Sequence, residues 1–190
     1  MTEEAAVLQT RASRASAAKK KSGVWGWVRF ALLLAVAMIV LHNLTGLTRV
    51  SGHSMDPTLQ NGSVLLINKL SLFLGAPQYG DVVIVKDDRL GYTIVKRVIA
   101  VGGDRVAIRD GVTYVNDVPL VELYTYGTSE DMAEQTVGMD DLFLAGDNRT
   151  PGASLDSRDP KLGTVHTSEI KGYALMSLVP FHKISKPLKL

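Results

Sequence analysis

One apolar segment, residues 24–44, limits what this chain of 190 residues can fold into. Its central part, residues 30–41, reads FALLLAVAMIVL and has no polar side chain. About 20 such residues cross a bilayer as a helix. A helix buried in a soluble core would show a polar stripe, and a removable leader would end in a small-x-small site, for which HNLTGLTRV is a poor match. The segment therefore predicts a retained membrane-spanning helix.

Charges around this segment predict its orientation. Basic side chains outnumber Glu3 and Glu4 before it, and such an excess stays on the cytoplasmic side of a membrane. Arg29 lies near the start of the segment, where its side chain can reach the headgroups. We therefore expect residues 1–23 to form a disordered cytoplasmic tail, residues 24–44 to span the lipid bilayer, and residues 45–190 to lie outside the cytoplasm. The basic residues before the segment are Arg11, Arg14, Lys19, Lys20 and Lys21.

Composition argues against several classes of function. The formal net charge of +2 combines a basic tail with an acidic remainder, so the region after the span has little electrostatic attraction for nucleic acid. The chain has no cysteine, which removes disulfides and every cysteine nucleophile. Its four histidines include no H-x-x-x-H pair, so neither a zinc site nor another cofactor is predicted.

After the apolar segment, the sequence has the pattern of short β-strands. Runs of β-branched and apolar residues are bounded by Gly, Asn and Asp. Asp110-Gly111 separates two alternating runs, which is the strongest short signal for a hairpin. Residues 124–138 are polar and irregular, and we expect a surface excursion there. The pattern predicts a mainly β domain, an antiparallel sheet folded as a barrel or sandwich, with strands at residues 63–68, 81–86, 92–101, 141–146 and 172–180.

The segment VSGHSMDPTL, residues 50–59, holds Ser54 between a glycine turn and a proline turn. Such a position suits a nucleophile, and a serine nucleophile needs a base, most often histidine. His53 is adjacent to Ser54, and neighbours in an extended chain point in opposite directions. His42 lies at the membrane boundary and His182 in a lysine-rich tail. Only His166 remains as a histidine candidate, and no sequence context marks it.

A lysine can replace histidine if burial lowers its pKa far below about 10.4. Lys96 lies in the apolar run YTIVKRVIAV, and on a strand it shares its face with Tyr92, Ile94 and Val98. Such a lysine either reaches solvent at an edge or is desolvated, and the pattern leaves both possibilities open. SAAK and SEIK match the S-x-x-K pattern of another serine–lysine class, but its accompanying S-D-N and K-T-G sequences are lacking.

A third stretch, GDNRTPGASLDSRD at residues 146–159, is dense in Asp, Asn, Arg and Ser. Such a stretch is either a solvated loop of Asx and Ser turns or a support that pairs carboxylates with arginines. Together and in this order, the stretches resemble type I signal peptidases, the membrane-bound serine–lysine endopeptidases. GHSMDPTL is similar to the nucleophile box, GDVVIVK to a strand box, YTIVKRVIAVGGD to the lysine box, and GDNR with SLDSR to the last box. The single span and short chain are most similar to the Gram-positive kind.

The resemblance implies a hydrolase that removes signal peptides from preproteins emerging from the export machinery. Ser54 would be its nucleophile and Lys96 its general base. It also implies small residues at the first and third positions before the cut. The supporting residues that it implies are an Asp156–Arg158 salt bridge, Asp147 and Arg97 in the same polar support, and Ser154, which would orient the Lys96 amine.

Two positions depart from the family pattern. The family usually has two residues between GDNR and S-x-D-S-R, whereas this chain has four, TPGA. Counting forward from Gly146 reaches Gly152, whereas counting back from Asp156 reaches Ser154, and we prefer Ser154 because a loop tolerates insertions. Gly52 stands where some relatives have a serine that contributes to the oxyanion hole, which leaves the backbone N–H of the nucleophile as the main donor.

Two other interpretations are weaker. The self-cleaving repressors of the DNA-damage response resemble this domain, but they are cytosolic and carry DNA-binding segments. The apolar segment and the acidic remainder argue against them. A catalytically inactive β-rich anchor or binding module is disfavoured by the intact pair of Ser54 and Lys96. Cleavage of a leader-bearing precursor, compared with the Ser54→Ala variant, separates these interpretations.

Overall fold

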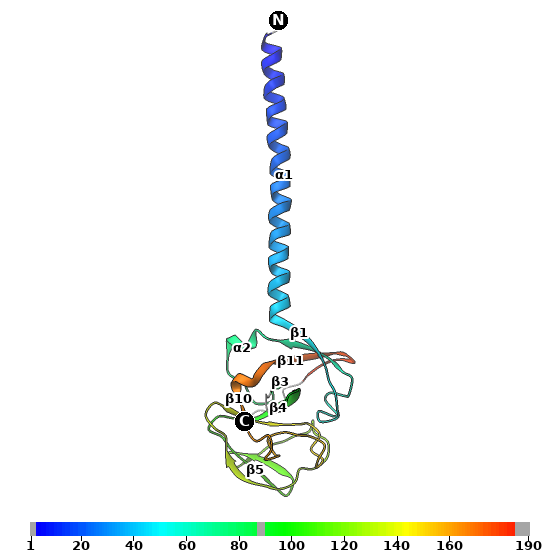
Figure 1. Ribbon diagram of the computed structural model, residues 1–190, viewed down its shortest axis with the longest axis vertical. Helices are drawn as coiled ribbons and strands as arrows, with labels where there is room; N and C mark the ends of the chain where they lie inside the picture. The colour runs from blue at the N-terminus through cyan, green and yellow to red at the C-terminus, as the bar shows by residue number, and fades with distance from the viewer. Residues whose placement is uncertain (1–2, 87–89, 185–190) are drawn as a thin grey trace. The chain divides into compact units, whose positions relative to one another are not determined.

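The computed structural model describes residues 3–86 and 90–184, with side chains from residue 23 onward. The chain divides into two units, Met1–Asn43 and Leu44–Leu190. Helix α1 (Glu3–Leu44) is drawn as one uninterrupted helix in Figure 1. Its part Gly23–Leu44 is long and apolar enough to cross a membrane, and it starts one residue before the predicted span. The helix also covers residues expected to be disordered, because that tail is rich in Ala and Lys, which are good helix formers.

The second unit is mainly β, which confirms the predicted fold class, and its strands form two antiparallel sheets. In the larger sheet the order is β1-β2-β11-β3-β4-β9-β10, and β12 pairs with β11. Its strands are β1 (Thr45–Arg49), β2 (Val64–Asn68), β3 (Val82–Lys86), β4 (Thr93–Val101), β9 (Asp141–Ala145), β10 (Val165–His166), β11 (Ile170–Val179) and β12 (Phe181–Lys183).

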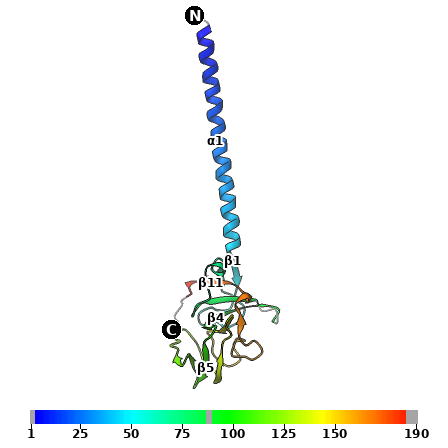
Figure 2. The same cartoon turned by 90° about the vertical axis from the view of Figure 1, so that its left-hand side faces the viewer.

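The smaller sheet has the order β7-β6-β5-β8, and β5 lies at the end of this unit away from β1 in both views (Figures 1 and 2). Its strands are β5 (Arg105–Arg109), β6 (Val112–Val115), β7 (Val118–Pro119) and β8 (Met132–Thr136). Two short helices complete the unit, α2 (Ser71–Leu74) and the 3₁₀ helix η1 (Thr167–Glu169).

The predicted strands agree with β2, β3, β4, β9 and β11 to within two residues at each end. The predicted hairpin joins β5 to β6, and both turn residues, Asp110 and Gly111, have positive φ, as a two-residue hairpin turn requires. The excursion expected at residues 124–138 contains a strand, β8, so that prediction was wrong in part. MAEQT is poor in strand-forming residues, and β8 exists because it pairs with β5.

Strand β4 lies at the centre of the domain. Val98 packs with Val83 and Leu144 in one cluster of buried residues. Ile99 packs with Phe143 in a second cluster, to which Val106 and Val115 of the smaller sheet also belong. Strand β4 is therefore held on both sides, so polar side chains that it carries have little freedom to move.

Candidate active site

Ser54 lies in the loop between β1 and β2, and this loop is anchored in the protein core. The N–H of Gly62 donates to the carbonyl of Val50 at 2.9 Å, which closes the loop at its base. The side chains of Met55 and Leu59 are fully buried, and the N–H of Leu59 donates to the carbonyl of Met55 at 2.8 Å. The serine therefore precedes a firmly packed turn.

Strand β4 brings Lys96 to Ser54. The sequence left open whether Lys96 reaches solvent at a sheet edge or is desolvated. The residue is only 3% exposed, so it is desolvated. Its Nζ donates a hydrogen bond to Ser54 Oγ at 2.7 Å. The fold thus joins two residues from separate elements by a direct contact between Nζ and Oγ.

Burial lowers the pKa of Lys96 from 10.5 to about 8, because the ammonium loses its hydration. The carboxylates of Asp156 and Asp147 act in the opposite direction, whereas the guanidinium of Arg158 adds to the lowering of this pKa. A charged ammonium has no lone pair, but a lysine with this pKa is partly neutral near neutral pH. The pair therefore has both the distance and the protonation equilibrium for proton transfer from Ser54 Oγ to Lys96 Nζ.

The next residue on β4, Arg97, forms a fully buried ion pair with Asp147. Its Nε and Nη2 bind the two carboxylate oxygens at 2.8 and 2.7 Å, and Nη1 donates to the carbonyl of Gly80 at 2.9 Å. The guanidinium also lies 4.4 Å from the centre of the Tyr124 ring. Bidentate pairing of this kind fixes orientation as well as distance. Asp147 is thus tied to the strand that carries Lys96.

Asp156 collects hydrogen bonds from several directions. Its carboxylate accepts from Arg158 Nε and Nη2 at 2.8 and 2.7 Å, from the N–H of Gly146 at 2.9 Å, and from Ser154 Oγ at 2.5 Å. Burial by itself would raise the pKa of Asp156, but the Arg158 guanidinium and the other two donors bring it below its usual value. Asp156 is therefore a buried anion that joins β9 to the loop after it.

Ser154 differs from its expected role. The resemblance implies a hydrogen bond between Ser154 and the Lys96 amine, whereas Ser154 Oγ donates to Asp156. Within the described part of the chain, no hydrogen bond links Ser154 to Lys96, whose Nζ contacts Ser54. A buried carboxylate is a stronger acceptor than an amine or a hydroxyl, which explains the choice of partner.

The segment after β9 is bound directly to the loop that carries Ser54. The N–H of Asn148 donates to the carbonyl of Ser54 at 3.0 Å, and Asn148 Nδ2 donates to the carbonyl of His53 at 3.1 Å. A Cβ on Gly146 would collide with the Ser54 carbonyl oxygen and with Ser154 Oγ. This position therefore needs a glycine for close approach, although its φ is not positive.

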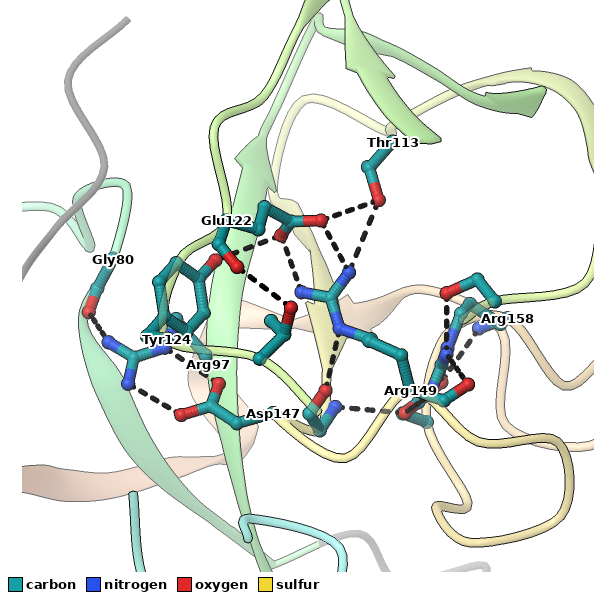
Figure 3. A network of polar contacts seen from close by, with 12 residues as sticks. Gly80, Arg97, Thr113, Glu122, Tyr124, Asp147, Arg149 and Arg158 are labelled. Atoms are coloured by element: carbon teal, nitrogen blue, oxygen red, sulfur yellow. Dashed lines mark hydrogen bonds and ion pairs between the residues drawn. The ribbon is translucent and has the colours of Figure 1, made fainter. Parts of the chain in front are cut away.

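Sequence reasoning missed Glu122, which binds Arg149 of this segment (Figure 3). Its carboxylate pairs with the buried guanidinium of Arg149, with Nη1 2.8 Å from Oε2, and it accepts from the hydroxyls of Thr113 and Tyr124 at 2.9 Å each. Arg149 Nε in turn donates to the carbonyl of Gly146 at 2.8 Å. Arg149 was visible in GDNR, but Glu122 stands in a stretch without any motif, so no sequence signal linked the two.

The histidines of the described domain have partners other than Ser54. His53 Nδ1 lies 2.9 Å from Asp56 Oδ2, and His166 Nδ1 lies 2.8 Å from Ser168 Oγ. His182 Nε2 lies 2.9 Å from a backbone carbonyl. Within the described residues, no histidine is hydrogen-bonded to Ser54. The geometry therefore favours lysine over histidine as the partner of Ser54.

A cleft of about 520 Å³ opens over Ser54 and Lys96. It lies between the loop that follows β1 and the beginning of β4. We call it the catalytic cleft. Its lining combines apolar and polar side chains. The apolar ones are Val50, Met55, Ile94, Val95, Ala153 and Leu155, and the polar ones include Ser51, His53 and Thr93 besides Ser54 and Lys96.

The groups near the cleft bear on two further points of chemistry. Within the described part of the chain, the N–H of Ser54 has no hydrogen-bond acceptor, so it is available to an oxyanion. Gly52 offers no hydroxyl, and its N–H donates to Asn61 Oδ1 at 3.0 Å. Among the same residues, no group of three or more His, Asp or Glu side chains is placed to hold a metal ion.

Comparison with known proteins agrees with these features. The family described as "Signal peptidase, peptidase S26" matches residues 24–179. A signal peptidase I of Bacillus amyloliquefaciens is 30% identical, with 96% of this chain and 97% of that protein covered. A signal peptidase I of Bacillus licheniformis is 32% identical, with 88% and 95% covered.

Among solved structures, the crystal structure of a signal peptidase I from Enterococcus faecalis V583 is 28% identical to this chain. The match covers 52% of this chain and 97% of that one, with a TM-score of 0.45. The family match extends over most of the sequence, from the apolar segment to β11. This chain therefore belongs to the signal peptidase family, peptidase S26.

Proposed function

We propose that this protein is a membrane-anchored serine endopeptidase that cleaves N-terminal signal peptides from exported proteins, with Ser54 as nucleophile and Lys96 as general base. The observation that carries the proposal is the 2.7 Å contact between Lys96 Nζ and Ser54 Oγ at a buried lysine. Family membership and relatives named signal peptidase I support the substrate class.

The proposed reaction begins with attack on the peptide bond. Neutral Lys96 takes the proton of Ser54 as Oγ attacks the carbonyl carbon, and the N–H of Ser54 stabilises the oxyanion. The protonated lysine then gives its proton to the leaving amine, and the C–N bond breaks. An ester between Ser54 and the last residue of the signal peptide remains.

The second half of the reaction uses the same lysine. Neutral Lys96 takes a proton from a water molecule as that water attacks the ester carbon. The bond to Ser54 Oγ breaks, the serine recovers a proton from Lys96, and the signal peptide leaves with a new carboxylate. Four charged residues support the pair without touching the reacting atoms. They fix the positions of β4 and of the segment after β9, and they are Arg97, Asp147, Asp156 and Arg158.

The proposed site of action is the outer face of a membrane. The Gly23–Leu44 segment would span the lipid bilayer, with the basic tail in the cytoplasm and residues 45–190 outside. A protease added to intact protoplasts should digest a tag placed after Leu190 and spare one placed before Met1. The reverse pattern would exclude this orientation.

Cleavage of a purified precursor tests the function itself. The full chain, solubilised in detergent, should shorten a leader-bearing precursor at one position. Ser54→Ala should abolish this cleavage, whereas Ser168→Ala, which changes an exposed serine of η1, should leave it unchanged. Cleavage that persists in Ser54→Ala, or an absence of cleavage by the wild type, would refute the proposal.

A further inference from the structure

A second hollow, of about 580 Å³, lies beside the catalytic cleft. Both are bordered by His53, the residue before the nucleophile. We call the second one the polar hollow, because apart from Pro57 its lining is polar or aromatic: His53, Asp56, Gln60, Asn61, Tyr126 and Asn148. The two hollows therefore meet at the residue next to Ser54.

The walls of the polar hollow are fixed to the loop of the nucleophile. Asn148 is hydrogen-bonded to the carbonyls of Ser54 and His53, as described above. The N–H of Tyr126 donates to the carbonyl of Asp147 at 3.0 Å, and its own carbonyl accepts from the N–H of Arg149 at 2.6 Å. The backbone of each wall is thus positioned relative to Ser54 Oγ, which distinguishes this hollow from an ordinary gap between surface loops.

Tyr126 has a constrained backbone, but its side chain is largely exposed. It is 64% exposed, and within the described part of the chain its hydroxyl has no hydrogen-bond partner. The amides of Gln60 and Asn61 Nδ2 are also without partners among the described residues. Together they offer an aromatic face and several hydrogen-bonding groups to a backbone that passes through the hollow.

A signal peptide cleavage site has a side before the cut and a side after it. The side before the cut ends in small residues, which the apolar side chains of the catalytic cleft can contact. The side after the cut continues past Ser54, and the polar hollow meets the catalytic cleft at the neighbouring residue, His53. We propose that the polar hollow binds the first residues of the mature protein, and that Tyr126 is a contact for them; this inference rests on the proposed function.

Two substrates with the same leader distinguish peptide binding in the polar hollow from bond cleavage at Ser54. One continues into several polar residues after the cut, and the other ends in a compact ester that reaches no further than the catalytic cleft. Tyr126→Ala should lower kcat/KM about fivefold or more for the first substrate, as truncation of a contact aromatic does, and leave the ester substrate within about twofold. Phe181→Ala is the control, because Phe181 is an aromatic residue of similar exposure on β12, outside both hollows.

A second measurement does not depend on the stability of that variant. A short peptide added during turnover can attack the Ser54 ester through its amino group: a C–N bond forms, the bond to Oγ breaks, and Ser54 regains its proton. We call this attack on the ester trapping. If the polar hollow binds peptides, the rate of trapping by an added peptide should saturate as the peptide concentration rises. The rate of trapping by ammonia should not saturate. Gln60→Trp, which fills the hollow from an exposed position, should weaken the saturation about tenfold.

The possible outcomes distinguish a failure of this inference from a failure of the proposed peptidase function. Equal losses on both substrates in Tyr126→Ala, or peptide trapping that is no more saturable than trapping by ammonia, would overturn the role of the hollow while leaving signal peptide cleavage intact. A wild-type enzyme that is inert toward both substrates would overturn the proposed function, and the inference would fall with it.

Discussion

Gly146 lies directly against the carbonyl oxygen of Ser54, so closely that a Cβ at this position would collide with that oxygen. The contact is the point at which the segment after β9 meets the loop that carries Ser54. Two positions further on, the N–H of Asn148 donates to the same oxygen at 3.0 Å. The position of Ser54 relative to Lys96 therefore depends on a residue that has no side chain.

Gly146→Ala should strongly reduce cleavage, because the added methyl group pushes the Ser54 loop or Ser154 out of place. Overpacking of this kind costs about 1–3 kcal/mol of stability, and misplacement of a reacting atom costs more in rate than in stability. Precursor cleavage and thermal unfolding measure the two effects. Gly75→Ala is the matched control, because nothing lies within 4 Å of a Cβ there and its φ of 172° is extended. Equal activities in the two variants would contradict the account of this contact.

Asp156→Ala should destabilise the protein and lower its activity. The change leaves Arg158, which is only 15% exposed, without its carboxylate partner. Breaking such a buried pair costs about 3 kcal/mol, the lower end of the usual range, because Arg158 keeps some access to water. Thermal unfolding should show a clear fall in Tm relative to Glu130→Ala, which removes a carboxylate at an exposed position.

Asp156→Ala should also move the pH dependence of the remaining activity. The Asp156 carboxylate raises the pKa of Lys96, so its removal should shift the inflection of the rate to lower pH. A variant that matches Glu130→Ala in Tm and in pH profile would reduce the Asp156–Arg158 pair to an incidental contact.

The sequence predicted most of the strands because they are short β-branched runs between turn-forming residues. The strands that it missed, such as β1 and β8, are not apolar runs of this kind: TGLTR and MAEQT exist as strands because β2 and β5 pair with them. Their formation depends on partners that lie far away in the chain. Local pattern cannot contain that information.

The candidate site divides in the same way. Lys96 stood out because a lysine on an apolar face is either at an edge or desolvated, whereas the supporting role of Arg97 came only from the family resemblance. The Glu122–Arg149 pair was not recognisable, because its two residues come from different loops that only the fold brings together. The partner of Ser154 was also beyond sequence reasoning, since Asp156 and Lys96 are both suitable by type and only the geometry selects Asp156.

Lys96→Met should abolish cleavage and yet stabilise the protein at neutral pH. The pKa of Lys96 falls from 10.5 in the unfolded chain to about 8 in the folded one, so below pH 8 the folded state bears the cost of burying a charge. At about 1.4 kcal/mol per pKa unit, this cost is about 3 kcal/mol. Methionine has a similar length and no charge, so it avoids the cost, although it loses the hydrogen bond to Ser54.

The sign of the pH dependence makes this prediction specific. Because the folded pKa is the lower one, the unfolded state binds more protons between about pH 8 and 10.5, and wild-type stability rises with pH over this window. The advantage of Lys96→Met should therefore be largest below pH 8 and shrink above it. Denaturant unfolding at several pH values measures the difference, and an advantage that grows with pH would show that Lys96 is not a desolvated lysine.

The central claim is that neutral Lys96 is the base for Ser54, and the pH dependence of kcat/KM for precursor cleavage tests it most directly. This quantity reports the ionisation of the free enzyme. Lys96→Arg serves as the companion variant, because an arginine keeps the charge and cannot be deprotonated in a protein. The account predicts that wild-type kcat/KM rises with pH through a single inflection near 8, the pKa of Lys96, and that Lys96→Arg remains folded but inactive at every pH. An inflection near 6.5, as for an ordinary histidine, or substantial cleavage by Lys96→Arg would contradict it.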